Sequence, residues 1–178
     1  MEHTTFAALD FETANQARDS ACSLGLVLVD GGRIAARQNW LIRPPSREFQ
    51  FTHIHGITWD MVRSAPSFRE VWLEARELLR GAEFLAAHNA AFDRSVLTAC
   101  CSTAGLSTPT LEFRCSMLLA RKVLGIRPAD LETVASRLRI PLKHHDALSD
   151  AEACARIVMA ATSGGGVRGR VCGRGVRR

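Results

Sequence analysis

The chain has 178 residues, of which 47% are hydrophobic and 23% charged, and these values are typical of one soluble globular domain with its own core. No run of apolar residues is long enough to span a bilayer, which argues against a membrane protein and against a membrane partner. The N-terminal stretch MEHTTFAALDFE is acidic and lacks the layout of a signal peptide, so we expect a cytoplasmic location.

The formal net charge of +5 is concentrated at one end of the chain. Residues 163–178 contain five arginines and no acidic residue, so the formal charge of residues 1–162 is near zero. We therefore expect one folded domain over 1–162 and a disordered Gly/Arg-rich tail over 163–178. Two interpretations of the tail stay open, electrostatic binding of phosphates and a passive extension.

Six cysteines occur without any CxxC pair, and two of them, Cys100 and Cys101, are adjacent. In a chain without an export signal, this pattern favours reduced core thiols over a disulfide framework. A zinc site would need closely spaced ligand pairs, and the cysteines supply none.

The first part of the chain is predicted to form three successive strands. Residues 4–10 and 23–32 are mainly apolar, and the second run ends in a Gly-Gly turn signal. Residues 33–45 return as the partner strand and stop at a Pro-Pro pair. This pattern predicts an antiparallel meander.

Strands and helices alternate in the rest of the chain. Ser67 and Glu70 form a capping-box signal, and apolar residues then recur at helical spacing as far as Gly81. The remaining predicted elements are a strand at 83–89, a helix that ends near Gly105, a strand at 111–116, a helix capped by Asp130 and a last helix after Asp146. Together these elements predict an α/β fold, a mixed five-stranded sheet flanked by helices.

Two carboxylates stand at the end of the first predicted strand, in the stretch FAALDFETAN. Because side chains alternate along a strand, Asp10 and Glu12 lie on one face and Phe11 on the other. Carboxylates so close repel each other by about 1 kcal/mol or more, and a divalent cation such as Mg²⁺ or Mn²⁺ would relieve the repulsion. An exposed strand end with two solvated acids is the alternative, and this motif alone does not exclude it.

Two further segments add acids at the ends of predicted elements. LAAHNAAFDRSVL places Asp93 near the start of a helix, and KHHDALSDAEA places His145 five residues before Asp150. Helix N-termini favour anionic side chains, and a histidine with a pKa near neutrality can take a proton from water. Three acid clusters and one histidine form the set that two-metal phosphodiester hydrolysis requires.

The segments ALDFET, HNAAFD and HHDALSDA, in this order, resemble the three motifs of the DEDDh 3′–5′ exonuclease family. This is the DnaQ-like group, which includes the proofreading epsilon subunit of bacterial DNA polymerase III. The segment HIHGITWDMV is also similar to the family's segment between the first two motifs, and the resemblance covers about residues 4–162. A sister class carries tyrosine in place of the histidine, and this chain contains no tyrosine.

The resemblance implies a ribonuclease-H-like fold and a phosphodiester hydrolase. The enzyme would release nucleoside 5′-monophosphates from single-stranded DNA or RNA 3′ ends, with DNA somewhat favoured. Asp10, Glu12, Asp93 and Asp150 would hold two Mg²⁺ or Mn²⁺ ions, with Asp10 bridging both, and His145 would be the general base. Contact with the terminal nucleotide is implied for a substrate-binding set of four residues, Thr13, His55, Asn89 and Phe92.

Several neighbours of these residues are expected to have other roles. The family's spacing of four intervening residues before the last aspartate selects His145, so we expect His144 to be a solvated loop residue. Asp146 is expected to cap the last helix, and His88 to make structural hydrogen bonds. For Phe92, packing in the core is the alternative to contact with a base.

Two other functions stay open. One is a catalytically inactive nucleic-acid-binding or scaffold protein on the same fold, and the other is a proofreading subunit associated with a DNA polymerase. The presence of all four acids and the histidine argues against the first. The tail has three valines as its only apolar anchors, which puts a dedicated polymerase subunit in doubt. The sequence does not determine sugar preference or oligomeric state.

Overall fold

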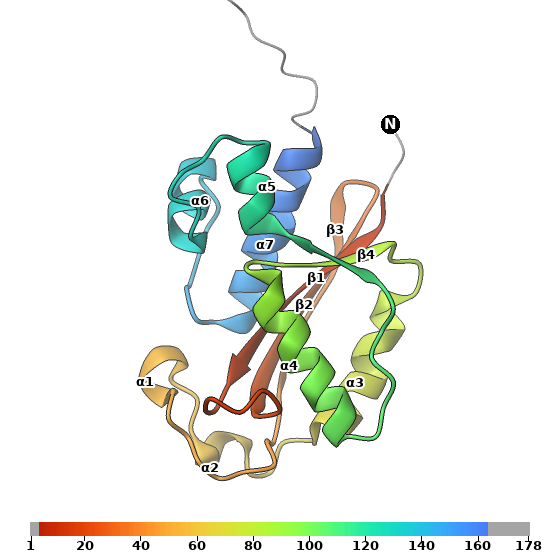
Figure 1. Cartoon of the computed structure of the whole chain (residues 1–178), viewed down its shortest axis with the longest axis vertical. Helices are drawn as coiled ribbons and strands as arrows, with labels where there is room; N and C mark the ends of the chain where they lie inside the picture. Colours follow the sequence, from red (N-terminus) through yellow and green to blue (C-terminus); the bar gives the residue numbers. More distant parts are fainter. Residues whose placement is uncertain (1–3, 164–178) are drawn as a thin grey trace, which may run out of the picture.

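The computed structural model describes residues 4–163, which form a mixed five-stranded sheet with helices on both faces (Figure 1). The strands are β1 (Phe6–Thr13), β2 (Ala21–Asp30), β3 (Arg33–Leu41), β4 (Phe84–Ala87) and β5 (Glu112–Cys115). The helices are α1 (Thr52–His55), α2 (Trp59–Val62), α3 (Phe68–Ala75), α4 (Ala90–Thr103), α5 (Ser116–Lys122), α6 (Leu131–Leu138) and α7 (Ala147–Ser163). The predicted α/β fold with five strands is confirmed.

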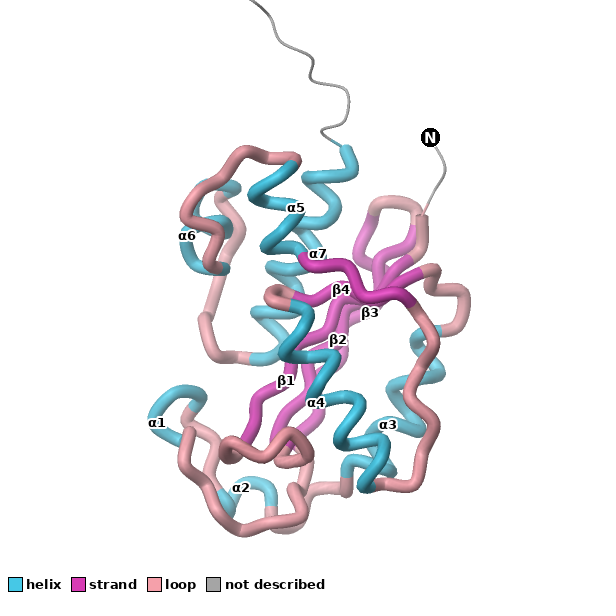
Figure 2. Tube along the Cα trace, viewed as in Figure 1, coloured by secondary structure: helices cyan, strands magenta, loops and turns pink. Residues whose placement is uncertain are grey.

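The strands lie in the order β3-β2-β1-β4-β5 (Figure 2). β1, β2 and β3 pair in antiparallel fashion, as the predicted meander requires, whereas β4 pairs parallel to both β1 and β5. The turn between β2 and β3 contains Gly31 and Gly32 with φ of 56° and 73°, a region that glycine enters without steric cost. This order makes β1 the central strand.

Side chains of β1 alternate between two hydrophobic cores. Leu9 and Phe11 pack on the face covered by α3 and α4, whereas Phe6 and Ala8 pack on the face covered by α7. Asp10 and Glu12 continue the second series. They therefore lie on the α7 face, as the alternation predicts.

The predicted caps start three of the helices. Ser67 and Glu70 form a reciprocal capping box at α3, in which the Ser67 N–H donates to Glu70 Oε2 at 2.7 Å. Asp130 accepts from the N–H of Thr133 at 2.8 Å, which caps α6. The corresponding bond at α7 runs from the Ser149 N–H to Asp146 Oδ1 at 3.1 Å.

Other elements differ from the predictions. The helix expected to continue to Gly81 changes to a 3₁₀ turn over Arg76–Leu79. The sequence did not predict α1, α2 or α5, because helices of four to seven residues are too short to show a hydrophobic period.

Three properties of the described part bear on the predictions from composition. Within residues 4–163, no helix is long and apolar enough to cross a membrane. The five cysteines in this range are free thiols, as expected. The predicted tail over 163–178 lies outside the described residues except for Ser163, which ends α7.

The first turn of α7 lies directly against β2 at Gly25. This glycine is the cross-strand partner of Asp10. A Cβ atom at Gly25 would lie 2.1 Å from the carbonyl oxygen of Ala147 and 2.5 Å from the nitrogen of Leu148. Because both atoms belong to backbone, they cannot turn away as a flexible side chain could. A residue without a side chain is therefore required for α7 to approach the sheet beside Asp10.

We expect Gly25→Ala to lower the free energy of unfolding by about 3 kcal/mol or more, because overpacking against backbone forces the helix away from the sheet. Gly32→Ala is the matched control, because its Cβ would meet nothing within 4 Å and only the backbone strain at φ +73° remains. Denaturant unfolding of both variants measures the difference. Equal losses would show that the close approach at Gly25 is not a constraint.

Candidate active site

Three carboxylates converge where β1 ends. Asp10, Glu12 and Asp150 each place one carboxylate oxygen within 4.8 Å of the other two. The first two come from alternate positions of β1, and the third from the first turn of α7, which Gly25 allows to lie against the sheet. Three of the four predicted acids are therefore neighbours in space.

Asp150 is the most constrained member of this trio. Its side chain is buried, and Oδ2 accepts a hydrogen bond from the backbone N–H of His145 at 3.0 Å. The other oxygen of Asp150, Oδ1, is also buried, and it has no hydrogen-bond partner among the described residues. A buried carboxylate oxygen without a partner is costly unless a cation or another donor reaches it. The oxygen donors of the trio thus fit a hard divalent cation such as Mg²⁺ or Mn²⁺.

Asp93, the fourth predicted acid, lies beside β1 but outside the 4.8 Å group. It is almost fully buried on α4, and its Oδ1 accepts the N–H of Phe11 at 3.1 Å. Phe11 stands between Asp10 and Glu12 in the chain. Asp93 therefore anchors the acid-bearing end of β1 to the first turn of α4, and its second oxygen does not take part in that bond.

Burial raises the pKa values of all four acids, and repulsion from other acids of the group adds to the shift at Asp10, Glu12 and Asp93. The pKa of Asp10 lies well above its usual value, first through burial and then through the charges of Asp93, Asp150 and Glu12. Burial, followed by the charge of Asp150, raises the pKa of Glu12 to about 7. Burial also raises the pKa of Asp93 to about 7 and that of Asp150 to about 6.

Basic groups do little to offset this negative charge. Within residues 4–163, the one basic side chain within ion-pair distance of the four acids is His144, whose Nε2 lies 3.9 Å from Asp150 Oδ2. Because the protein itself supplies no compensating lysine or arginine there, a bound cation would relieve the repulsion.

Two histidines stand at the entrance to the acids. The rings of His144 and His145 are stacked, with centroids 3.9 Å apart and planes 13° apart. Both place a ring nitrogen within 4.8 Å of an Asp150 oxygen. His144 is exposed as predicted, but it lies at the site and not away from it. The spacing that selected His145 did not reveal that the ring of His144 also lies within 4.8 Å of Asp150.

The backbone of His145 adopts an unusual conformation. Its φ is 65°, which costs a non-glycine residue about 1 kcal/mol or more, and the bond from its N–H to Asp150 helps to hold it. Burial and the adjacent His144 lower the pKa of His145. A lowered pKa keeps the imidazole neutral near pH 7, which is the form that accepts a proton.

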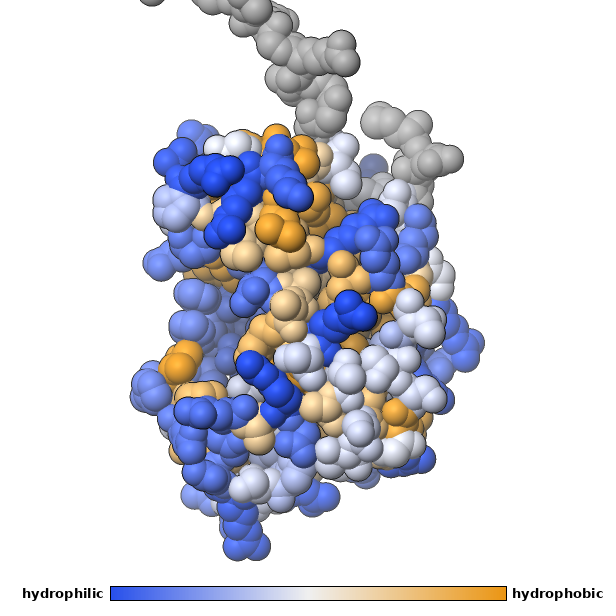
Figure 3. Space-filling view, viewed as in Figure 1, coloured by the Kyte–Doolittle hydropathy of each residue, from blue (hydrophilic) through white to orange (hydrophobic). Residues whose placement is uncertain are grey.

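A cavity of about 590 Å³ opens beside the carboxylates. In Figure 3 the surface is indented on the left of the view, between α6 and α1, and both helices contribute residues to the lining of this cavity. Its lining includes all four members of the predicted substrate-binding set, Thr13, His55, Asn89 and Phe92. It also includes residues that the sequence did not suggest as site residues, Phe51, Ile54, Met117, Asp130 and Leu131.

Hydrogen bonds commit both ring nitrogens of His55. Nδ1 accepts the N–H of Ile57 at 3.0 Å, and Nε2 donates to the carbonyl oxygen of Thr13 at 3.1 Å. This pair of bonds fixes one neutral tautomer, and burial lowers the pKa of His55. His55 thus joins α1 to the end of β1, and only its ring face is free to meet a ligand.

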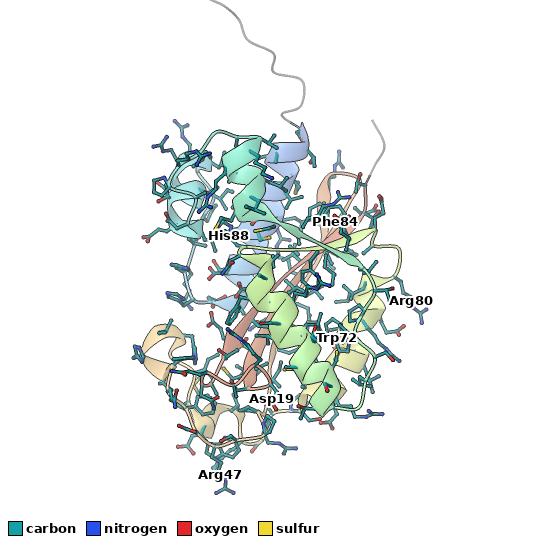
Figure 4. All side chains as sticks on the ribbon, in the orientation of Figure 1. Asp19, Arg47, Trp72, Arg80, Phe84 and His88 are labelled. Atoms are coloured by element: carbon teal, nitrogen blue, oxygen red, sulfur yellow. The ribbon has the colours of Figure 1, made fainter. Side chains whose placement is uncertain are left out.

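His88 has the structural role that the sequence predicted. Its Nε2 donates to the carbonyl oxygen of Ala129 at 3.0 Å, and its Nδ1 lies 2.8 Å from Ser116 Oγ. These bonds tie the end of β4 to α5 and to the segment before α6 (Figure 4). The next residue, Asn89, is exposed with φ of 67° and starts α4 at the edge of the cavity.

Phe92 packs in the core, and its place in the cavity lining leaves contact with a base as a prediction. Its side chain is half-buried and packs against the core formed by β1, α3 and α4. The same residue lines the cavity. One part of the aromatic ring is therefore core, and another part is available to a ligand.

Comparisons with known proteins agree with this geometry. A family model described as "Exonuclease" matches residues 7–158. The PolC-type DNA polymerase III of Oceanobacillus iheyensis is 33% identical over 154 residues, which cover 84% of this chain and 11% of that protein. The epsilon subunit of Escherichia coli DNA polymerase III is 32% identical over 118 residues, 62% of this chain and 48% of the subunit. The chain thus spans less than half of either polymerase protein.

Two solved structures match nearly the whole described part. Exonuclease X in complex with 5′-overhanging duplex DNA has a TM-score of 0.74 and 25% identity, covering 92% of this chain and 94% of that one. The nuclease domain of 3′hExo, a DEDDh family member bound to rAMP, has a TM-score of 0.79 and 17% identity, with the same coverage, and shows the fold. The family-model match establishes that the chain belongs to the exonuclease family, and its similarity to the polymerase III proteins supports the predicted DnaQ-like group.

Proposed function

We propose that the chain is a metal-dependent 3′–5′ exonuclease that releases nucleoside 5′-monophosphates from single-stranded ends, with DNA favoured over RNA. The observation that carries the proposal is the trio of Asp10, Glu12 and Asp150 with its buried, unpartnered carboxylate oxygen. Membership of the exonuclease family supports the same reaction class. The near-zero formal charge of residues 1–162 supports capture of a strand end over a charge-based grip on duplex DNA.

In this proposal the acids would hold two divalent cations. Asp10, Glu12 and Asp150 would supply carboxylate oxygens as ligands, and Asp93 would add the oxygen that is not bonded to Phe11. Mg²⁺ and Mn²⁺ suit these oxygen donors, and the bound ions would supply Lewis-acid stabilisation of the charge that develops on the phosphate.

The protein's own groups position the water and the nucleotide. Neutral His145 would take the proton from the attacking water, and its backbone bond to Asp150 keeps the histidine next to the acids. The terminal nucleoside would occupy the cavity, where Phe92 and Ile54 offer apolar surface to the base. This arrangement leaves the phosphate on the 5′ side of that nucleoside at the carboxylates.

A DNA polymerase is proposed as a further partner. Three of the curated relatives are DNA polymerase III proteins, which supports this association. Co-purification of the full chain with a polymerase tests it.

The proposed reaction is tested with matched DNA and RNA oligomers that carry a label at the 5′ end. With Mg²⁺, we expect a ladder that shortens from the 3′ end, and the initial rates report the sugar preference. Asp10→Asn should reduce the rate to the no-enzyme background, because it removes a ligand charge and keeps the side-chain volume. Without metal, its thermal midpoint should rise by about 2–4 °C per kcal/mol of repulsion relieved. A folded Asp10→Asn protein with undiminished activity would contradict the proposal.

Metal binding should stabilise the protein more at high pH than at low pH. The raised pKa values mean that the folded chain binds more protons than the unfolded chain between about pH 4 and pH 7. The stability of the metal-free protein therefore falls as the pH rises through this window. Protons and Mg²⁺ compete for the same oxygens, so Mg²⁺ should restore stability above the window and have little effect below it.

Thermal unfolding with EDTA or saturating Mg²⁺ measures this difference. We expect Mg²⁺ to raise the midpoint by about 5–10 °C near pH 8 and by little near pH 5. Asp150→Asn provides the control, because it should lose most of the Mg²⁺ effect. An equal Mg²⁺ effect at both pH values would show that the four acids are not the binding site.

Asparagine substitutions distinguish the roles of the two histidines. Asparagine tolerates the positive φ at position 145, so His145→Asn removes the base and keeps the backbone conformation. We expect kcat to fall about 10²- to 10⁴-fold in His145→Asn, whereas the Mg²⁺-induced midpoint shift is kept. His144→Asn is the matched control and should retain kcat within a few-fold. The reverse order of effects would make His144 the base.

A further inference from the structure

The loop between β1 and β2 places one arginine, Arg18, against an aromatic residue that lines the cavity. The Cζ atom of Arg18 lies 4.8 Å from the ring centroid of Phe92, and Phe92 lines the cavity. The Arg18 side chain is exposed, so its guanidinium is stacked on one side and accessible to solvent elsewhere. Stacking holds the planar group in place while its N–H edges stay free to donate.

The loop itself is fixed by internal hydrogen bonds. Asn15 and Ser20 are both buried, and they exchange bonds across the loop, from the Asn15 N–H to Ser20 Oγ at 3.2 Å and from Ser20 Oγ to the Asn15 carbonyl oxygen at 3.0 Å. Asn15 Oδ1 also accepts the N–H of Ala17 at 2.9 Å. The Cys100 thiol of α4 donates to the carbonyl oxygen of Arg18 itself at 3.7 Å. The position of Arg18 is therefore set before any ligand arrives.

The guanidinium of Arg18 forms no ion pair among the described residues. The adjacent Asp19 accepts a hydrogen bond from Thr103 Oγ1 at 3.0 Å, which directs this carboxylate toward α4. In the range 4–163, no carboxylate lies within 4.0 Å of the Arg18 guanidinium. By contrast, Arg114, which stacks on Phe84 at 3.8 Å, lies 3.6 Å from Glu112. Arg18 is thus a positioned cation without an ion-pair partner in the range 4–163, stacked on a residue that lines the cavity.

We propose that Arg18 binds a backbone phosphate of the substrate strand, on the 5′ side of the bond that is cleaved. This inference rests on the proposed function. A phosphodiester matches the guanidinium, because its two free oxygens can accept a pair of parallel N–H donors. When a 3′-terminal nucleoside occupies the cavity, the scissile phosphate lies at the carboxylates. Every other phosphate of the strand then lies on the 5′ side of the cut, so the ligand of Arg18 is one of these.

The consequence is a difference between substrates of different length. An oligonucleotide offers a phosphate to Arg18, whereas a nitrophenyl ester of a nucleoside 5′-monophosphate contains only the phosphate that is attacked. Arg18 should therefore contribute to binding of the oligonucleotide and have no part in turnover of the ester. A purely structural role in supporting Phe92 would affect both substrates alike.

The experiment compares the full-length chain with Arg18→Gln in the presence of Mg²⁺. We expect KM for a single-stranded oligonucleotide to rise about tenfold with kcat little changed. The slope of log(kcat/KM) against log[salt] should decrease by about 0.7, the value for one phosphate contact on a single strand. Both constants for the nitrophenyl ester should stay at the wild-type values. Arg18→Lys, which keeps the charge but loses the planar fork, should restore the salt slope and only part of the KM.

Arg114→Gln is the matched control, because it removes another arginine that is stacked on an aromatic ring, and Phe84 does not line the cavity. This control should behave as wild type with both substrates. The inference is overturned if Arg18→Gln leaves the oligonucleotide KM and salt slope unchanged, or if it impairs the ester equally. If the wild-type chain itself cleaves neither substrate, the proposed function fails, and that result is distinct from a failure at Arg18.

Discussion

Repulsion among buried carboxylates is the constraint on which the rest of this structure depends. Two unit charges about 4 Å apart interact by about 4 kcal/mol at the effective dielectric of a protein surface, and Asp10, Glu12 and Asp150 have oxygens within 4.8 Å of one another. The folded chain holds them together without a lysine or arginine in ion-pair contact within residues 4–163. Burial and, for Asp10 and Glu12, the charges of neighbouring acids raise the pKa values, so these carboxylates bind protons more readily in the folded chain. A site built in this way favours a cation, because binding one removes a penalty that the apo fold carries.

Several local features hold the acids in place against this repulsion. The N–H of Phe11 bonds to Asp93, and the N–H of His145 bonds to Asp150, so backbone donors on two segments fix the two most buried carboxylates. Gly25 adds a steric condition, because only a residue without Cβ lets the first turn of α7 reach the sheet beside Asp10. These contacts are spread over β1, β2, α4 and α7. The geometry of the site is therefore a property of the packed fold and not of any one motif.

Acidic and apolar side chains occupy different parts of the lining of one cavity. The acids and the two stacked histidines occupy the side formed by β1 and the start of α7. Apolar and aromatic side chains from α1, α4, α5 and α6 form another part of the lining, and His55 and His88 tie α1, α5 and the segment before α6 to the ends of β1 and β4. The loop before β2 adds a positive charge where Arg18 stacks on Phe92. In the proposed function, the 3′ end of a nucleic-acid chain would meet the apolar surface and the acids in the cavity, and the cation beside Phe92.

The sequence by itself determined those features that depend on neighbours a few residues apart. Strand alternation placed Asp10 and Glu12 on one face, capping residues fixed the starts of α3, α6 and α7, and the order of three acidic motifs indicated the family. Distances between segments that are remote in the sequence were decided only by tertiary structure. The bond from Phe11 to Asp93 and the contact of Arg18 with Phe92 belong to this second class. The short helices α1 and α5 belong to it as well, since fewer than eight residues give no readable period. Local patterns follow from the geometry of one strand or helix, whereas a site between elements is set by how their side chains and backbones pack.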